Sequence, residues 1–181
     1  TETKLEIEFL GGCYNTLNNK VMTDVACDII KNMPGPQWTQ EELDFAQKLN
    51  EASPQYEAMK AAGLLEGSPI YTGEAKITTR DGGGSTDVGD VQHIVPCMML
   101  TTATCNLAAP GHSWQITACA GMSIGMKGMI YGAKVMAATA MKLVEDPKLV
   151  EEAKAEFAKQ MNGKTYKCPI PKEIPVPQPQ K

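Results

Sequence analysis

The sequence predicts an α/β protein in which helices cover sheets, and two observations support this prediction. Predicted strands alternate with predicted helices along the 181 residues, as in layered α/β folds. The strands also differ in kind, because residues 4–10 are apolar on one face only, whereas residues 91–105 are apolar on both. We therefore expect the first strand to belong to a different sheet from the later ones.

The N-terminal stretch "KLEIEFL" at residues 4–10 predicts a half-exposed strand. Leu5, Ile7 and Phe9 share one face, and charged residues occupy the other. Gly11-Gly12 ends the alternation, so the strand should end there.

Two amphipathic helices are predicted next. Asn18 or Asn19 can cap the first, which the "PGP" at residues 34–36 should end. "TQEE" at residues 39–42 is a capping box, in which the threonine hydroxyl accepts from the last glutamate's N–H and that carboxylate reaches back. The second helix should run to about Asn50.

The middle of the chain predicts a short helix and further strands. The helix starts at Ser53-Pro54 and stops at Gly63, and "AKITT" at residues 75–79 is a short strand. A glycine run begins at residue 82, and the apolar residues 91–105 form the strands covered on both faces.

Two long helices and a tail complete the chain. We expect helices over residues 122–145 and 148–161, with Asp146 as a cap and Pro147 at the first helical position. Three glycines in the first of them predict close packing against a neighbouring element: Gly125, Gly128 and Gly132. Residues 164–181 are proline-rich and should lie extended or disordered.

Composition excludes several classes of protein. The net charge is −4 with scattered signs, which argues against nucleic acid or an anionic membrane as a partner. No apolar run reaches the roughly 20 residues of a bilayer-spanning helix, and the first ten residues are no secretory signal. The six cysteines are irregularly spaced, so we expect reduced thiols and a cytoplasmic protein.

The residues with chemical potential are few. The glycine run at residues 82–84 can expose backbone N–H groups to an anion or carboxylate, although a structural turn is the competing interpretation. Asp87 and Asp90 could bind metal or act in acid/base chemistry, but helix capping is the simpler account. His112 lies in a tight loop where α/β folds gather ligands, or else is a solvated loop residue. His93 is expected to be a packed histidine.

The motif "GGGSTDVGD" at residues 82–90, "PGHSW" at 110–114 and the glycine-rich helix from Ser123 together resemble the C-terminal part of the dinuclear metallo-amidohydrolases. That family comprises aminoacylases, carboxypeptidases and aminobenzoyl-glutamate hydrolases, and the likeness is greatest to the last of these. The resemblance spans nearly the whole chain and weakens after about residue 162.

The resemblance implies a three-layer α/β/α catalytic domain interrupted by a lid domain that mediates dimerisation. Residues 1–15 would be the last strand of the lid, residues 16–163 the C-terminal segment of the catalytic domain, and residues 164–181 the extended tail. His112 matches the family's last metal-ligand histidine. The loop that matches the family's substrate-binding loop consists of Gly83, Gly84, Ser85, Thr86 and Asp87.

The activity implied is hydrolysis of the amide bond of N-acyl amino acids such as aminobenzoyl-glutamate, or of dipeptide-like substrates. It would use two divalent ions, zinc or manganese, and a homo-oligomer is expected. The family's general base and other ligands would precede Thr1, so the chain resembles a C-terminal segment that needs the N-terminal part of the same enzyme and is inactive alone.

Two alternatives stay open from the sequence. One is a non-catalytic binding or interaction module that retains a remnant of the fold. The other is a metal or redox protein whose ligands are cysteines: Cys97, Cys105 and Cys119.

Overall fold

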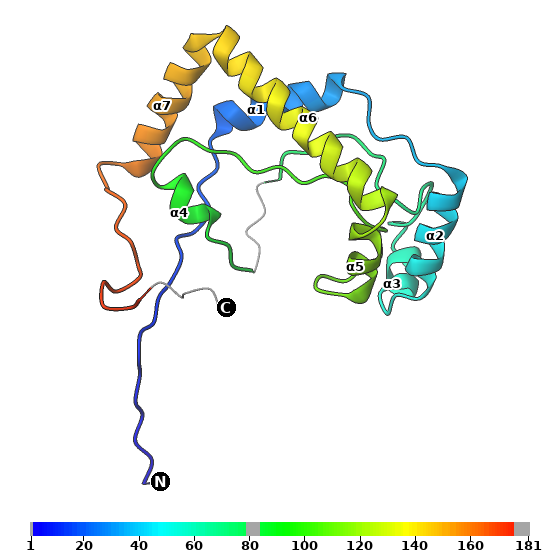
Figure 1. The fold of residues 1–181 in the computed structure, drawn as a ribbon, viewed down its shortest axis with the longest axis horizontal. Helices are drawn as coiled ribbons and strands as arrows, with labels where there is room; N and C mark the ends of the chain where they lie inside the picture. The colour runs from blue at the N-terminus through cyan, green and yellow to red at the C-terminus, as the bar shows by residue number, and fades with distance from the viewer. Residues whose placement is uncertain (1, 79–83, 176–181) are drawn as a thin grey trace. The chain divides into compact units, whose positions relative to one another are not determined.

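The computed structural model describes residues 2–78 and 84–175, which divide between two units (Figure 1). Unit 1 comprises the described parts of residues 1–22, 79–98 and 148–181, and unit 2 comprises residues 23–78 and 99–147. The helices, in chain order, are α1 (Lys20–Asn32), α2 (Gln40–Glu51), α3 (Tyr56–Ala61), α4 (Val88–Gln92), α5 (Trp114–Ala120), α6 (Ser123–Glu145) and α7 (Pro147–Met161).

The predicted α/β sandwich is wrong, because the structure is mostly helical and the described residues form no sheet. Within the described residues, the β-pairing consists of one isolated antiparallel bridge between Ile70 and Asn106. Residues 96–104, part of the stretch expected to hold buried strands, carry no ladder. Val91 and Gln92 of the same stretch belong to α4. A short apolar run fits a buried helix or a strand equally well, so the pattern at residues 91–105 was not sufficient to predict strands.

The amphipathic stretch at residues 4–10 is also unpaired. Its apolar face is open, with Leu5 80%, Ile7 82% and Phe9 62% exposed. The alternating pattern predicts which face a strand would bury, but a strand forms only where a neighbouring strand takes up its backbone hydrogen bonds. The short strand expected at residues 75–79 is likewise not formed over residues 75–78, and Thr79 lies outside the described residues.

Most of the predicted helices are confirmed. The helix expected after Asn19 is α1, and the Asn19 Oδ1 accepts from the backbone N–H of Met22 at 3.1 Å. The helix expected after Thr39 is α2, and the full capping box is present. Pro147 begins α7 as predicted. Local signals within one turn of a helix therefore predicted the structure well.

Unit 2 is built around a small apolar core. Its buried members are Ala46, Leu49, Ile70, Cys119 and Ile124. The buried side chain of Asn50 binds the loop of Asn106 and Ala108 to this core. Its Oδ1 accepts from Asn106 Nδ2 and from the Ala108 backbone N–H, both at 2.8 Å. A buried amide held by several hydrogen bonds in this way fixes one arrangement of the chain around it.

The expected close packing of the α6 glycines is confirmed. Gly125, Gly128 and Gly132 are buried. A Cβ on Gly128 would overlap the backbone carbonyl of Ala103. Other positions of α6 carry exposed apolar side chains, among them Met129 at 64% and Met141 at 62%.

Unit 1 joins the start of α1 to α7 and to the segment after α4. Asn19 is buried, and its Nδ2 donates to the carbonyl of Ala153 in α7 at 2.9 Å. Its backbone N–H donates to the carbonyl of Cys97 at 2.8 Å. The carboxylate of Glu156 accepts from the N–H groups of Lys20 and Val21, which satisfies two free donors at the helix N-terminus.

None of the helices in the part of the chain that the structure describes is long and apolar enough to cross a bilayer. The domain boundaries expected at residues 15 and 163 stay predictions.

Candidate functional site

His112 precedes α5 in a loop of unit 2. The residue is exposed, and its backbone has φ 57°, in the left-handed region that is uncommon for residues other than glycine. Gly111 precedes it, and Trp114, 60% exposed, begins the helix two residues later. The loop therefore presents an imidazole at the surface of unit 2 on a strained backbone.

Ser113 occupies the N-cap position of α5, directly after His112. Its backbone is extended, but its side chain makes no capping hydrogen bond to the helix. The Oγ atom is buried and, among the described residues, finds no hydrogen-bond partner. Most buried hydroxyls in proteins are hydrogen-bonded, so the Ser113 Oγ beside the exposed imidazole is an exception to the rule.

The predicted substrate loop lies in unit 1, and Gly83 falls outside the described residues. Gly84 has φ 130°, and a Cβ added to it would meet no atom of the described residues within 4 Å. Ser85 is exposed, and the Thr86 hydroxyl accepts from the N–H of Val88 at 3.3 Å. The loop is therefore open on the side of Gly84, where a ligand could approach the backbone.

Asp87 and Asp90 do not cap α4 as the simpler account expected. Asp87 is exposed at the N-cap position without a side-chain hydrogen bond to the helix. Asp90 lies within α4 and accepts from the backbone N–H of Tyr14 at 3.3 Å and from the Tyr166 hydroxyl at 3.0 Å. Asp90 thus holds two distant parts of unit 1 together, a role that the sequence did not reveal.

The Asp90 carboxylate also changes the chemistry of Tyr166. Loss of hydration, followed by the hydrogen bond to Asp90 and its charge, raises the pKa of Tyr166 to about 12. The phenol therefore stays protonated at neutral pH and donates to Asp90.

A metal centre is not complete in the described residues. Those residues contain no group of three or more histidine, cysteine, aspartate or glutamate side chains that could hold an ion. His112 stands in unit 2 and the loop of Gly84 to Asp87 in unit 1, so their meeting stays a prediction. The side chains present do not form a dinuclear centre on their own.

The cysteines give no support to a thiolate site. All six are free thiols. Burial raises the pKa values of the Cys105 and Cys119 thiols, and the protonated form that results is a poor metal ligand and a poor nucleophile. Cys97 belongs to unit 1, whereas the other two belong to unit 2.

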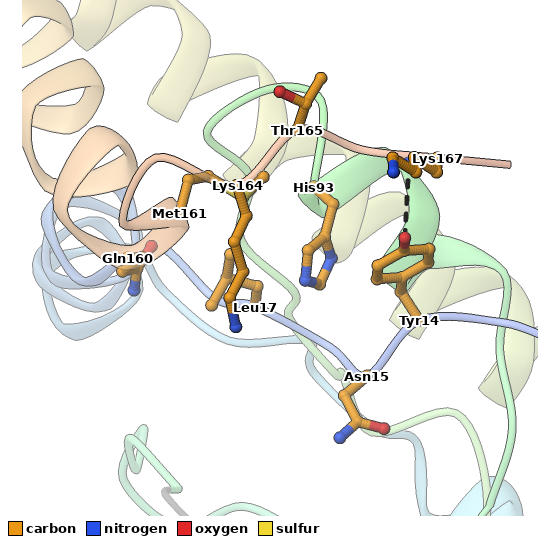
Figure 2. A pocket seen from close by; sticks show the side chains of 9 residues that line it. All are labelled: Tyr14, Asn15, Leu17, His93, Gln160, Met161, Lys164, Thr165 and Lys167. Carbon is orange, nitrogen blue, oxygen red and sulfur yellow. Dashed lines mark hydrogen bonds between the residues drawn. The ribbon is translucent and has the colours of Figure 1, made fainter.

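Unit 1 contains a cavity of about 510 Å³ that sequence reasoning missed (Figure 2). It is lined by Tyr14, Asn15, Leu17, His93, Gln160, Met161, Lys164, Thr165 and Lys167. These residues come from three separate segments of the chain, so no local motif could have predicted it. His93, expected to be simply packed, is half-buried, and its ring lies between Leu17 and Tyr14 in Figure 2.

The chain is similar to a component of the p-aminobenzoyl-glutamate hydrolase of Escherichia coli (strain K12), a protein named as one of that enzyme's subunits. The two are 30% identical over 191 aligned residues, which cover 96% of this chain and 40% of the relative. The chain therefore spans about 40% of the length of this curated relative. No family model and no solved structure matches the chain.

Proposed function

We propose that the chain is one part of a metal-dependent amidohydrolase that cleaves the amide bond of N-acyl amino acids, with aminobenzoyl-glutamate as the representative substrate. The supporting observation is the 30% identity that extends over 96% of the chain to a component of p-aminobenzoyl-glutamate hydrolase. A likeness over almost the whole chain favours a shared role more than a short shared motif would.

His112 is proposed as one ligand of a divalent metal ion, zinc or manganese. Its exposed imidazole is a common type of metal ligand, and the positive φ at this position is held at a cost in backbone energy. The adjacent Ser113 Oγ, buried and unpaired, is a second polar atom that needs a partner from outside the described contacts. In the intact enzyme the ions would polarise the amide carbonyl and activate water.

The loop of Gly83, Gly84, Ser85, Thr86 and Asp87 is proposed to receive the carboxylate end of the substrate. The open space at Gly84 lets a ligand reach the backbone N–H groups. The Thr86 hydroxyl is already engaged with Val88, so its role is to shape the loop. Asp87 carries a negative charge that would repel the substrate carboxylate. We therefore expect it to accept hydrogen bonds from neighbouring N–H or O–H groups of the site rather than to contact the substrate carboxylate.

The remaining ligands and the general base are proposed to come from other polypeptide, the N-terminal part of the same enzyme. The described residues offer one candidate histidine and no cluster of three ligands. A homo-oligomer is proposed for the intact enzyme. The 181-residue chain alone is therefore expected to be inactive.

The test measures hydrolysis of aminobenzoyl-glutamate by the 181-residue chain alone and by the chain together with the proposed N-terminal part of the enzyme. Activity is expected only in the second case, and chelators should abolish it. His112→Ala should remove it, whereas Lys134→Ala, at an exposed position of α6 in the same unit, should leave it nearly unchanged. Chelator-sensitive hydrolysis by the chain alone would overturn the proposal.

The alternative is a non-catalytic module, favoured by the absence of a ligand cluster within the described residues. It predicts a different outcome of the same experiment. The completed protein would bind aminobenzoyl-glutamate without cleaving it, and His112→Ala would change neither result.

A further inference from the structure

We propose that unit 1 binds a small organic anion, a carboxylate with a flat apolar body, in the cavity between Tyr14, His93 and Lys164 (Figure 2). The cavity contains neither His112 nor the loop of Gly84 to Asp87, so this site goes beyond the proposed function and does not depend on it. Its volume of about 510 Å³ lies within the range of small-molecule sites.

The charge of the cavity favours an anion. Two lysines, Lys164 and Lys167, line it, and among the described residues no aspartate or glutamate does. Neither lysine forms an ion pair within residues 2–78 and 84–175. The nearby carboxylate of Asp90 already accepts from the Tyr14 N–H and the Tyr166 hydroxyl. An ammonium without a protein carboxylate partner is available to a charge-assisted contact with a ligand.

The walls of the cavity favour a flat apolar body over a bare inorganic ion. The rings of Tyr14 and His93 lie with centroids 4.6 Å apart, tilted by 48°. Tyr166 does not line the cavity, but it packs on Tyr14 with ring centroids 5.2 Å apart and so supports that wall. Leu17 and Met161 add aliphatic surface. An aromatic or planar ligand could stack in this setting and lose apolar surface to the protein.

Partly buried hydrogen bonds hold one side of the cavity in shape. Gln92 is fully buried; its Oε1 accepts from the Leu17 N–H at 2.7 Å, and its Nε2 donates to Asn18 Oδ1 at 2.7 Å. The His93 Nδ1 lies 2.7 Å from the carbonyl of Gly89 and must carry the proton, because a carbonyl only accepts. The ring is thereby fixed in orientation. A site whose walls are fixed in advance loses less entropy on binding.

Two further polar side chains line the cavity, Thr165 and Asn15, but Figure 2 shows them pointing in opposite directions, so the carboxylate is expected to rely on the lysines. Gln160 also lines the cavity, but its Nε2 already donates to the carbonyl of Asn18 at 3.0 Å. Lys164 and Lys167 follow α7 within four residues of each other, so the positive charge for the anion comes from this short segment.

The experiment compares two probes of the same shape, benzoate and benzamide, titrated into the 181-residue chain by NMR. Benzoate should bind at least tenfold more tightly than its neutral counterpart, with shifts in the signals of Tyr14, His93 and Thr165. Lys164→Gln and Lys167→Gln should each weaken benzoate about tenfold, the loss of one charge-assisted contact. Lys159→Gln is the matched control, since Lys159 is exposed on α7 and does not line the cavity.

Several outcomes would overturn this site. Equal binding of benzoate and benzamide would show that the lysines do not select an anion. Inorganic phosphate binding as tightly as benzoate would show that the apolar walls add nothing to binding. An equal loss with Lys159→Gln would show only a general attraction to positive charge. None of these results bears on hydrolysis by the completed enzyme, so the failure of this site is distinguishable from a failure of the proposed function.

Discussion

The carboxylate of Glu42 lies 2.7 Å from the ammonium of Lys127, and the Glu42 side chain is only 7% exposed. The Ser123 hydroxyl donates to the other carboxylate oxygen, Oε1, at 2.5 Å. The Thr39 backbone N–H donates at 2.7 Å to Oε2, the oxygen that faces Lys127. One residue therefore completes the capping box of α2 and binds the first two turns of α6. The sequence indicated the first of these roles but not the second.

Unfolding of unit 2 should become sensitive to acid through Glu42. Burial raises its pKa, but the contacts with Lys127, Ser123 and Thr39 outweigh burial and hold the pKa at about 2, below the ordinary value of 4.5. Because the folded pKa is lowered, this stability is present above about pH 4.5 and is lost as the pH falls toward 2. Denaturant titrations between pH 6 and pH 2 should show a loss of about 1–3 kcal/mol from this group.

The matched variants for that experiment are Glu42→Gln and Glu41→Gln. Glu42→Gln should lower stability at neutral pH and flatten the acid dependence, because the ion pair is gone at every pH. Glu41 is exposed in the same helical turn, so Glu41→Gln should retain the acid dependence of the unaltered chain. The same pH profile for both variants would contradict the assignment.

The packing of α6 predicts opposite signs for two glycine substitutions. Gly128→Ala should destabilise unit 2 by at least about 2 kcal/mol, because the new Cβ would overlap the Ala103 carbonyl, which is backbone and cannot turn away. Gly132→Ala places its Cβ 3.4 Å from Thr102 Cγ2, an ordinary contact, and gains up to about 1 kcal/mol of helix propensity. Thermal unfolding of both variants measures the difference, and equal midpoints would refute it.

Asn19 should be the most sensitive polar position of unit 1. Asn19→Ala removes the acceptor for the Met22 N–H and the donor to the Ala153 carbonyl, and it should cost about 2–3 kcal/mol. Asn19→Asp retains the acceptor but sets a carboxylate against the Ala153 carbonyl. It should therefore recover little of the stability that Asn19→Ala loses. Asn18→Ala, at the neighbouring position, loses a single side-chain bond to Gln92 and serves as the milder comparison. Chemical denaturation would decide, and an equal effect at both positions would argue against the buried role of Asn19.

The elements that the sequence predicted correctly depend on residues close together in the chain. The capping box joins Thr39 to Glu42, three residues apart, and the Asn19 cap reaches Met22 across the same interval. The spacing of such pairs is fixed by helix geometry, so the sequence alone determines whether they can form.

What the sequence did not predict depends on contacts between distant segments. Asp90 meets Tyr14 and Tyr166, each 76 residues away, and nothing in the local pattern near Asp90 indicates either partner. The cavity of unit 1 combines three such segments. The predicted strands failed for the same reason, because pairing requires a neighbour that the periodicity of one segment does not identify. His112 was recognised through resemblance, and its exposure and positive φ are new information from the structure.

The hydrogen bond from Tyr166 to Asp90 should delay ionisation of that phenol. Its pKa is raised to about 12 from an ordinary 10. Because the folded pKa is higher than the unfolded one, the stability from this contact is present below about pH 10 and is lost as the pH rises through about 12. Burial also raises the pKa of Tyr131, so a phenolate absorbance titration should show late ionisation of both tyrosines. Tyr166→Phe should remove the part near pH 12, and Asp90→Asn should move that part to lower pH. A transition near pH 12 that is unchanged in Tyr166→Phe would assign it to another tyrosine.

The unpaired N-terminal stretch should make the chain associate. Residues 4–10 are extended and have Leu5, Ile7 and Phe9 on one open face, and an unpaired segment of that kind can pair with a second chain. Ile7→Gln should shift sedimentation velocity profiles toward the monomer at every concentration, because it removes the central apolar side chain. Glu8→Gln, on the opposite face, alters polarity without loss of apolar surface and should leave association unchanged or slightly stronger, since it also removes a repulsive charge. If the unaltered chain sediments as a monomer over the whole concentration range, or if both substitutions act alike, this face does not mediate association.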